Sequence, residues 1–319
     1  MPGGERAPSR YARIEEALSD AFMQINRIVN RLNKDFDLGD FTPENRERYP
    51  WATCLEHPEP YASRLWEYPW AILESALEPG MVCADVGCGQ TPFTVYLKQI
   101  AGCSVIGFDS HADEPQERPY WGVSPDFASR TGIQFVRSNV ERIQWPDNSF
   151  DRVFCISVIE HISNPRHQVA GMREIARILK PGGLASISVD INVKQRVVEP
   201  LMLIWESGLS IHGTIDLTMP AQRFGIFHNG KQPSDVFGFV LCKPDASIRT
   251  DYGNASPLIE AWKVCCLRDT FGASYQGFHD ALEYIGRDLQ RNNRSGRPTF
   301  ITFLRVAAKI LLRRYPGTR

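Results

Sequence analysis

The chain has 319 residues, of which 43% are apolar and 23% are charged, and these proportions exclude disordered, collagen-like and fibrous proteins. Its length is enough for one large domain with additions or for two ordinary domains. The formal net charge of −1, from 36 basic and 37 acidic residues, argues against a nucleic-acid partner.

This charge is unevenly distributed along the chain. Residues 287–319 carry nine basic side chains and one acidic one, a net charge of +8. Residues 1–286 then hold 27 basic and 36 acidic side chains, a net charge of −9. An acidic body with a basic end indicates that the end meets another surface.

The cysteines and the apolar runs indicate the compartment. The eight cysteines include no CxxC pair, and several lie in apolar runs typical of buried strands. The polar first 20 residues do not resemble a secretory leader, and no apolar run reaches the roughly 20 residues of a membrane-spanning helix. We therefore expect a cytoplasmic protein with reduced cysteines.

In residues 1–70 we expect a helix followed by an aromatic cap. Residues 1–10 are rich in Gly, Pro and Arg, which predicts disorder, and Tyr11 to Leu38 shows the apolar spacing of one long amphipathic helix. The cap that follows is rich in Pro, Glu and aromatic residues, as in a lid or an anchor. Its Trp66 and Trp70 fit the wall of an acceptor pocket and fit core packing equally well.

Residues 71–245 alternate short apolar runs with helical stretches. Five strands are predicted within residues 81–191, and two more around Thr214–Thr218 and Val236–Cys242. This rhythm predicts an α/β fold: a Rossmann-like, doubly wound, seven-stranded and mostly parallel sheet with helices on both faces. An insertion at about 190–230 is expected to cover the acceptor.

A glycine-rich turn follows the first of these strands and suggests a nucleoside site. Gly87 and Gly89 permit a tight turn and a close approach of the backbone to a ligand. Twenty residues after Gly89, Asp109 ends the next strand, where a carboxylate can bind both ribose hydroxyls. Pro92 stands where a dinucleotide fingerprint has its third glycine, so a diphosphate ligand is disfavoured.

Four stretches in order resemble the class I S-adenosylmethionine-dependent methyltransferases of the broad small-molecule group. They are ADVGCGQ, FDS, the segment 138–162, and ILKPGGLASISV. The resemblance spans about residues 81–191. It implies the Rossmann-like fold, S-adenosyl-L-methionine as cofactor and methyl transfer as the activity, and it says little about the acceptor.

The resemblance also implies residues of the cofactor site. Asp85, Gly87 and Gly89 would hold the methionine end, and Asp109, followed by Ser110, would bind the ribose. Asn139 and Val140 stand where many relatives have an acid and a small apolar residue beside the adenine; Asn139 departs from that pattern but can accept the same hydrogen bond. The full set is Asp85, Gly87, Gly89, Asp109, Ser110, Asn139, Val140 and Ser157, the last at the end of the fourth strand.

The same region supplies candidates for catalysis. His161 follows the fourth strand and is a candidate general base, because an imidazole titrates near neutrality. A role in packing or helix capping is the alternative. Glu160 could orient His161 or contact the acceptor. We expect no metal site, because His212, Asp216 and His228 lack a regular ligand spacing.

Residues 246–319 are predicted to form a helical basic extension. In its segment 299–314, Arg305, Lys309 and Arg313 form a narrow cationic stripe on an apolar helix. Sixteen residues reach about 24 Å, which is too short to span a bilayer. The helix could contact a membrane peripherally, pack on its own domain or contact a second subunit as a homo-oligomer.

The sequence as a whole predicts a methyltransferase that modifies a hydroxyl of a sugar, a glycoconjugate or a secondary metabolite. The alternatives are an N- or C-methyltransferase acting on a small molecule or lipid, and a non-catalytic scaffold subunit that binds the cofactor. The expected partner is a small-molecule or glycan acceptor rather than nucleic acid.

Overall fold

The computed structural model divides the chain into two units, Met1–Arg249 and Thr250–Arg319. The residues that it describes all belong to the first unit: 7–36, 38, 63–110, 123–162, 164–191, 204, 207–216 and 235–244. The predicted extension of residues 246–319, with its cationic helix, lies outside the described residues.

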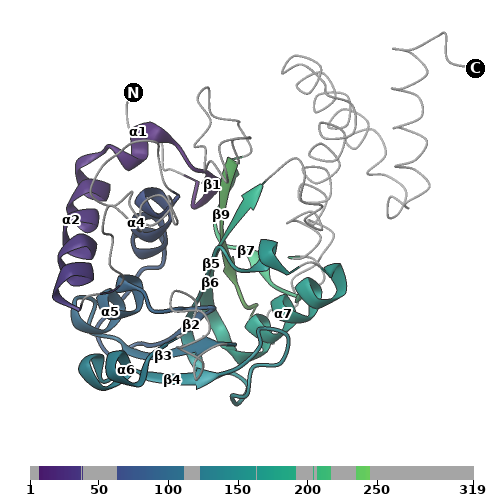
Figure 1. Ribbon diagram of the computed structural model, residues 1–319. Coiled ribbons are helices and arrows are strands. Elements are labelled where there is room, and N and C mark those ends of the chain that lie inside the picture. Colours follow the sequence, from purple (N-terminus) through teal and green to yellow (C-terminus); the bar gives the residue numbers. More distant parts are fainter. Residues whose placement is uncertain are drawn as a thin grey trace, which may run out of the picture. The chain divides into compact units, whose positions relative to one another are not determined.

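The described residues form a mixed sheet whose strand order is β4-β3-β2-β5-β6-β9-β1-β8, with β7 paired to β9 (Figure 1). The strands are β1 (Ser9–Tyr11), β2 (Val82–Val86), β3 (Ser104–Asp109), β4 (Gln134–Arg137), β5 (Phe150–Ile156), β6 (Leu179–Ile191), β7 (Ser210–Ile211), β8 (Ile215–Asp216) and β9 (Asp235–Cys242).

The five strands β4, β3, β2, β5 and β6 are parallel to one another, and β9 runs antiparallel to β6. The chain proceeds outward from β2 to β3 and β4, then returns to place β5 on the other side of β2. The carboxyl ends of β2 and β5 therefore flank the switch point at which such sheets bind ligands. The predicted Rossmann-like α/β fold is confirmed. The described residues form nine strands, two of them only two residues long, which agrees roughly with the seven that were expected.

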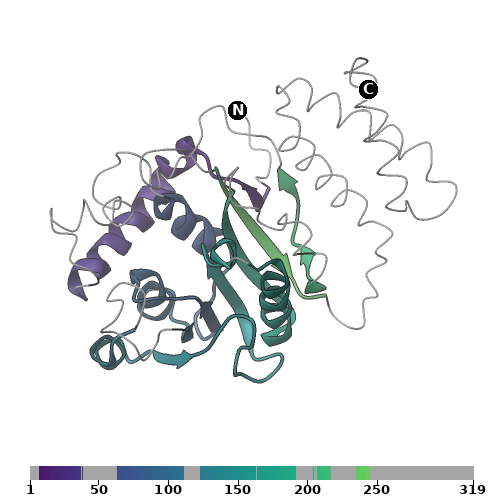
Figure 2. The ribbon, with the colours of Figure 1, turned by 45° about the vertical axis from the view of Figure 1, so that its right-hand side comes forward.

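Helices cover both faces of the sheet (Figures 1 and 2). They are α1 (Ile14–Ala17), α2 (Asp20–Asp35), α4 (Arg64–Glu74), α5 (Pro92–Gln99), α6 (Pro125–Thr131), α7 (Pro165–Ile178) and the 3-10 turn η2 (Ile159–His161). The side chains of α2, α4 and α5 share one apolar core with Leu184 of β6, whereas α7 packs on the opposite face of that strand. None of the described helices has the length and apolar character needed to cross a membrane.

The start of the chain is more ordered than the composition predicts. Ser9 and Arg10 are buried and belong to β1, which pairs with β9 and β8, so the prediction of disorder is wrong for these two residues. The Arg10 guanidinium forms an ion pair with Glu16 at 2.9 Å and with Glu74 at 2.7 Å. These two ion pairs, of which only the one with Glu74 is long-range, offset the conformational entropy that is lost when a polar segment becomes ordered.

The predicted single helix over Tyr11–Leu38 is also divided. Tyr11 belongs to β1, and the helical residues form α1 and α2 with a break at Leu18 and Ser19. Ser19 has the extended backbone of a residue that precedes a helix, so the amphipathic pattern continues while the backbone changes direction.

Trp66 and Trp70 of the predicted aromatic cap are core residues. Trp66 and Trp70 lie on α4, are fully buried and stack with ring centroids 5.1 Å apart. The Trp66 indole donates to Glu16 Oε2 at 2.7 Å, and the Trp70 indole donates to the carbonyl of Pro8 at 2.9 Å. Of the two roles expected for them, the structure shows core packing: they attach the N-terminal segment to the sheet.

Candidate functional site at the carboxyl edge of the sheet

The glycine turn after β2 is held against the end of β3. Gly87 and Gly89 have φ of +72° and +52°, in the left-handed region that strains other residues. The Gly87 N–H donates to the carbonyl of Phe108 at 2.7 Å, and the Gly89 N–H donates to Asp109 Oδ2 at 2.9 Å. The turn and the predicted ribose acid therefore form one unit.

Asp85 lies just before this turn and is almost completely buried. Its Oδ2 accepts a hydrogen bond of 2.8 Å from the hydroxyl of Thr94 on α5. Burial raises the pKa of Asp85 to about 7, since the charged form loses its hydration. Asp85 thus ties the turn to the helix behind it and can gain a full charge when a cation approaches.

The residues expected beside the adenine lie at the end of β4. The Ser138 N–H donates to the carbonyl of Asp109 at 3.0 Å, which places the following turn next to the ribose acid. In that turn Asn139 is exposed, and Val140 is half-buried against Gly171 of α7. Ser110 is half-buried directly after β3. The sheet thus brings the ends of β2, β3 and β4 together.

A buried polar cluster at the end of β5 joins Ser157 to the first turn of α4. Ser157 has a φ of +50°, and its hydroxyl donates to Glu67 Oε1 at 2.7 Å and accepts from Arg64 Nη1 at 2.7 Å. Arg64 also forms an ion pair with Glu67, and the Ser188 hydroxyl of β6 donates to Glu67 Oε1 at 2.5 Å. Burial opposes the ionisation of Glu67, but the Arg64 charge and the two hydroxyls outweigh it and lower its pKa.

Sequence reasoning missed Arg64 and Glu67 as site residues. Their i, i+3 spacing on a helix was the available signal, because it places a cation and an acid on one face. Neither residue lies inside the stretches that resemble a known family. The charge of Arg64 also reaches the carboxyl of Asp85, where it opposes the rise in pKa. The first turn of α4 therefore lies near the glycine turn as well as near β5.

Two further acids meet at the ends of β5 and β6. Glu160 of η2 accepts the backbone N–H of Asp190 at 3.1 Å, and the two residues are 4% and 6% exposed. Glu160 Oε2 and Asp190 Oδ1 have no hydrogen-bond partner among the residues that the structure describes. Burial raises the pKa of Glu160 well above its usual range and that of Asp190 to about 7. His161, the next residue, is exposed.

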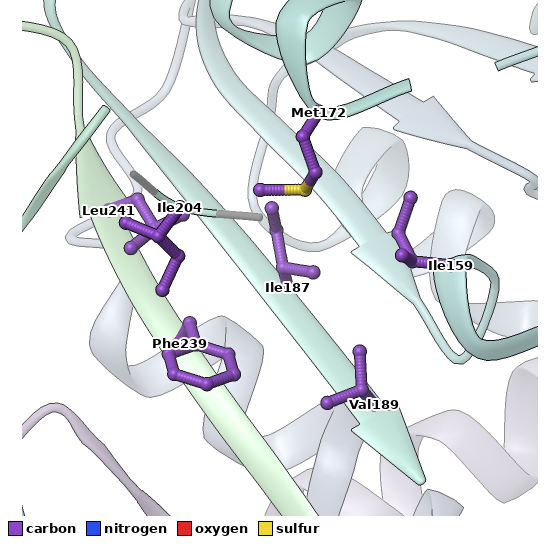
Figure 3. A pocket seen from close by; sticks show the side chains of 7 residues that line it. All are labelled: Ile159, Met172, Ile187, Val189, Ile204, Phe239 and Leu241. Atoms are coloured by element: carbon purple, nitrogen blue, oxygen red, sulfur yellow. The ribbon is translucent and has the colours of Figure 1, made fainter. Parts of the chain in front are cut away.

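The opposite face of β6 lines a small apolar pocket below α7 (Figure 3). Successive side chains of a strand point to opposite faces of the sheet. Ile187 and Val189 therefore point into the apolar pocket, whereas Ser188 and Asp190 point to the polar face beside α4. Its lining residues are Ile159, Met172, Ile187, Val189, Ile204, Phe239 and Leu241. The polar chemistry is thus confined to the carboxyl edge and the α4 face.

The donors and acceptors at this edge fit S-adenosyl-L-methionine. Asp109 suits the ribose hydroxyls, Asp85 suits the ammonium group, and the Arg64 guanidinium suits the carboxylate of the methionine moiety. A Cβ added to Gly89 would meet no side chain closer than 3.7 Å, which leaves room above the turn. Among the described residues, no three His, Cys, Asp or Glu side chains converge as metal ligands.

A doubly wound sheet with a glycine turn, a ribose acid and acidic side chains at its switch point defines a nucleoside-binding domain of the class I methyltransferase kind. Residues 84–187 match the family model described as a methyltransferase domain. The predicted resemblance to the class I S-adenosylmethionine-dependent methyltransferases is confirmed over this segment.

Individual relatives match over a limited part of their length. A "Probable tRNA methyltransferase 9B" of Mus musculus is 28% identical over 140 residues, which is 43% of this chain and 28% of that protein. A "Sterol 24-C-methyltransferase" of Yarrowia lipolytica is 27% identical over 146 residues, 44% of this chain and 37% of that protein. The structure of a SAM-dependent methyltransferase from Aquifex aeolicus is 19% identical and has a TM-score of 0.42, covering 64% of this chain and 100% of that one.

Proposed function

We propose that this chain is an S-adenosylmethionine-dependent O-methyltransferase. The acceptor would be a hydroxyl of a sugar, a glycoconjugate or another secondary metabolite. The observation that carries the proposal is the buried pair of Glu160 and Asp190 beside the cofactor residues. A hydroxyl must lose its proton during methyl transfer, and a carboxylate can receive it.

Each residue would act on a separate part of the reaction. The cofactor supplies a methyl group activated by its positive sulfonium. Asp109 and the glycine turn would orient the nucleoside of the cofactor. Arg64 would bind the carboxylate of its methionine moiety. The α4 face of β6, with Ser188 and Asp190, would receive the acceptor. The protein contribution is alignment of the two reactants and removal of one proton.

The charges favour a neutral hydroxyl over a cationic amine. An ammonium acceptor would meet the positive charge of Arg64 and the sulfonium of the cofactor in a buried setting, where like charges repel strongly. Burial raises the pKa of both Asp190 and Glu160, so this pair offers an ammonium group less negative charge than two ordinary carboxylates would. The names of the relatives, one acting on tRNA and one on sterol carbon, leave the acceptor of this chain open.

The proposed partners follow the same chemistry. The acidic residues at the carboxyl edge suit a small molecule or glycan and would repel a phosphate backbone. The basic segment of residues 287–319 is proposed to contact either anionic headgroups at a membrane surface or a second copy of the chain. We propose that the protein is located in the cytoplasm.

Calorimetric titration with S-adenosylmethionine tests the cofactor site. We expect Asp109→Ala to weaken binding by about 10- to 100-fold, because the charge-assisted hydrogen bonds to the ribose are lost. The matched control is Asp126→Ala, an acid on α6 whose side chain is 76% exposed, and it should bind like the unaltered protein. Equal affinity of both variants would remove Asp109 from the site.

An acceptor screen tests the reaction. The purified protein is incubated with the cofactor and matched pairs of compounds that differ only by a hydroxyl or an amine, and the release of S-adenosylhomocysteine is measured. We expect turnover with hydroxylated glycans or metabolites. Turnover with only the amine members, or only with lipids that lack a hydroxyl, would show that the proposed acceptor chemistry is wrong.

A further inference from the structure

The two acids at the ends of β5 and β6 are unusual in their bonding. In the described part of the chain, five buried side-chain oxygens lack a hydrogen-bond partner, and Glu160 Oε2 and Asp190 Oδ1 are the two that belong to acids. The oxygens of the adjoining cluster around Glu67 are bonded. Buried polar atoms are normally satisfied, so two unbonded oxygens on acids that are joined by a backbone hydrogen bond suit a ligand that supplies donors.

The surroundings of the pair distinguish its two members. The Glu160 carboxyl already accepts the Asp190 N–H through Oε1, and burial together with the nearby Asp190 charge raises its pKa well above the usual range. Burial and the Glu67 charge raise the pKa of Asp190 to about 7, while Arg64 acts in the opposite direction. Burial thus favours the protonated form of both carboxyls, and the Arg64 charge, which acts on Asp190, makes Asp190 the member of the pair that ionises more readily.

We propose that Asp190 is the proton acceptor of the reaction and that Glu160 positions the acceptor hydroxyl beside it. This inference rests on the proposed function and assigns a role to a residue that lies outside the pattern of the resemblance to methyltransferases. The acceptor oxygen donates its hydrogen bond to Asp190 Oδ1 and accepts one from the protonated Glu160.

The reaction balances without another reagent. The acceptor oxygen forms a bond to the methyl carbon, the bond from that carbon to sulfur breaks, and its electron pair remains on sulfur as a neutral thioether. The hydroxyl proton passes to Asp190 and later to water. Among the described residues, the charged groups that face Asp190 are Arg64 and Glu67 of α4 and Glu160 of η2. Proton transfer to Asp190 removes one negative charge from this cluster.

The first test uses stability and needs no acceptor. An acid whose pKa is raised by folding stabilises the folded state in its protonated form, and this contribution is lost as the pH rises through the raised pKa. Compared with Asp190→Asn, the unaltered protein should lose thermal stability from about pH 4 to about pH 7 and then remain level. If the melting temperatures of the two proteins changed with pH in the same way across this range, a buried, protonated Asp190 would be refuted.

The second test uses a hydroxyl acceptor that supports turnover in the screen. We expect Asp190→Asn to lower the turnover number by about 10²- to 10⁴-fold, which is the usual contribution of a general base. Glu160→Gln keeps a donor and should lose less. Calorimetric affinity for the cofactor should be unchanged in both variants, and Asp126→Asn controls for the exchange of an acid for an amide.

The outcomes separate this inference from the proposed function. If no hydroxyl compound is turned over by the unaltered protein, the proposed function is wrong and this inference falls with it. If the unaltered protein and Asp190→Asn turn over equally, only this inference is wrong. A large loss in His161→Ala together with full activity in Asp190→Asn would identify the exposed imidazole as the base and overturn the role of Asp190.

Discussion

Glu67→Ala should lower the free energy of unfolding by about 2–4 kcal/mol, because it leaves two buried hydroxyls without their acceptor and the half-buried Arg64 guanidinium without its carboxylate. Glu67 is fully buried, pairs with Arg64 and accepts the hydroxyls of Ser157 and Ser188. Its loss also releases the strained backbone of Ser157 at the end of β5. Chemical denaturation followed by tryptophan fluorescence measures the change, since Trp66 and Trp70 lie on the same helix.

Two further variants test whether the loss of stability in Glu67→Ala arises from the ion pair with Arg64. Glu78→Ala, an exposed acid just after α4, should change stability by less than about 0.5 kcal/mol. The double variant Arg64→Met with Glu67→Leu should recover much of the loss, since apolar residues of similar volume can replace a buried pair. A loss below about 1 kcal/mol in Glu67→Ala would show that the pair contributes little to the fold.

Gly87→Ala should abolish cofactor binding and destabilise the fold. A Cβ at this position would lie 2.4 Å and 2.9 Å from the two methyl groups of Val158, and the residue has a φ of +72°. Overpacking costs about 1–3 kcal/mol, and the left-handed conformation adds roughly 1–2 kcal/mol for a residue with a side chain. Titration with S-adenosylmethionine and thermal melting report the two effects separately.

Gly80 provides the matched control for the backbone contribution. It has a φ of +87°, but a Cβ there would meet nothing within 4 Å, so Gly80→Ala carries the strain without the clash. We expect it to melt at a higher temperature than Gly87→Ala and to bind the cofactor normally. Adding Val158→Ala to Gly87→Ala should recover part of the stability. Identical behaviour of the two single variants would mean that the contact with Val158 is unimportant.

The parallel strands could be predicted because their signals are local. The apolar runs that became β2, β3, β5 and β6 are continuous, and each is bounded by polar or glycine-rich turns. β1 has no such signal, because Ser9 and Arg10 are polar and their partners lie more than 200 residues away. The pairing of strands so far apart in the sequence depends on the assembly of the whole sheet, and the hydrophobic pattern around residues 9–11 does not indicate it.

The candidate site divides in the same way. The glycine turn and Asp109 could be found from spacing, because they lie within one strand, turn and strand unit and bind each other directly. Arg64, Glu67 and Asp190 could not be found so, because they lie on α4 and β6 and meet only when the sheet brings those elements together.

The sequence alone was sufficient to determine the Rossmann-like α/β fold, the methyltransferase class and the edge of the sheet at which the glycine turn and Asp109 lie, since each depends on contiguous residues. Only the tertiary structure decided that Trp66 and Trp70 belong to the core, that Arg64 and Glu67 close the end of β5, and that Glu160 and Asp190 share a buried place with unpaired oxygens. Burial is the physical reason: the pKa of an acid and the bonding of its oxygens depend on the neighbours that folding supplies.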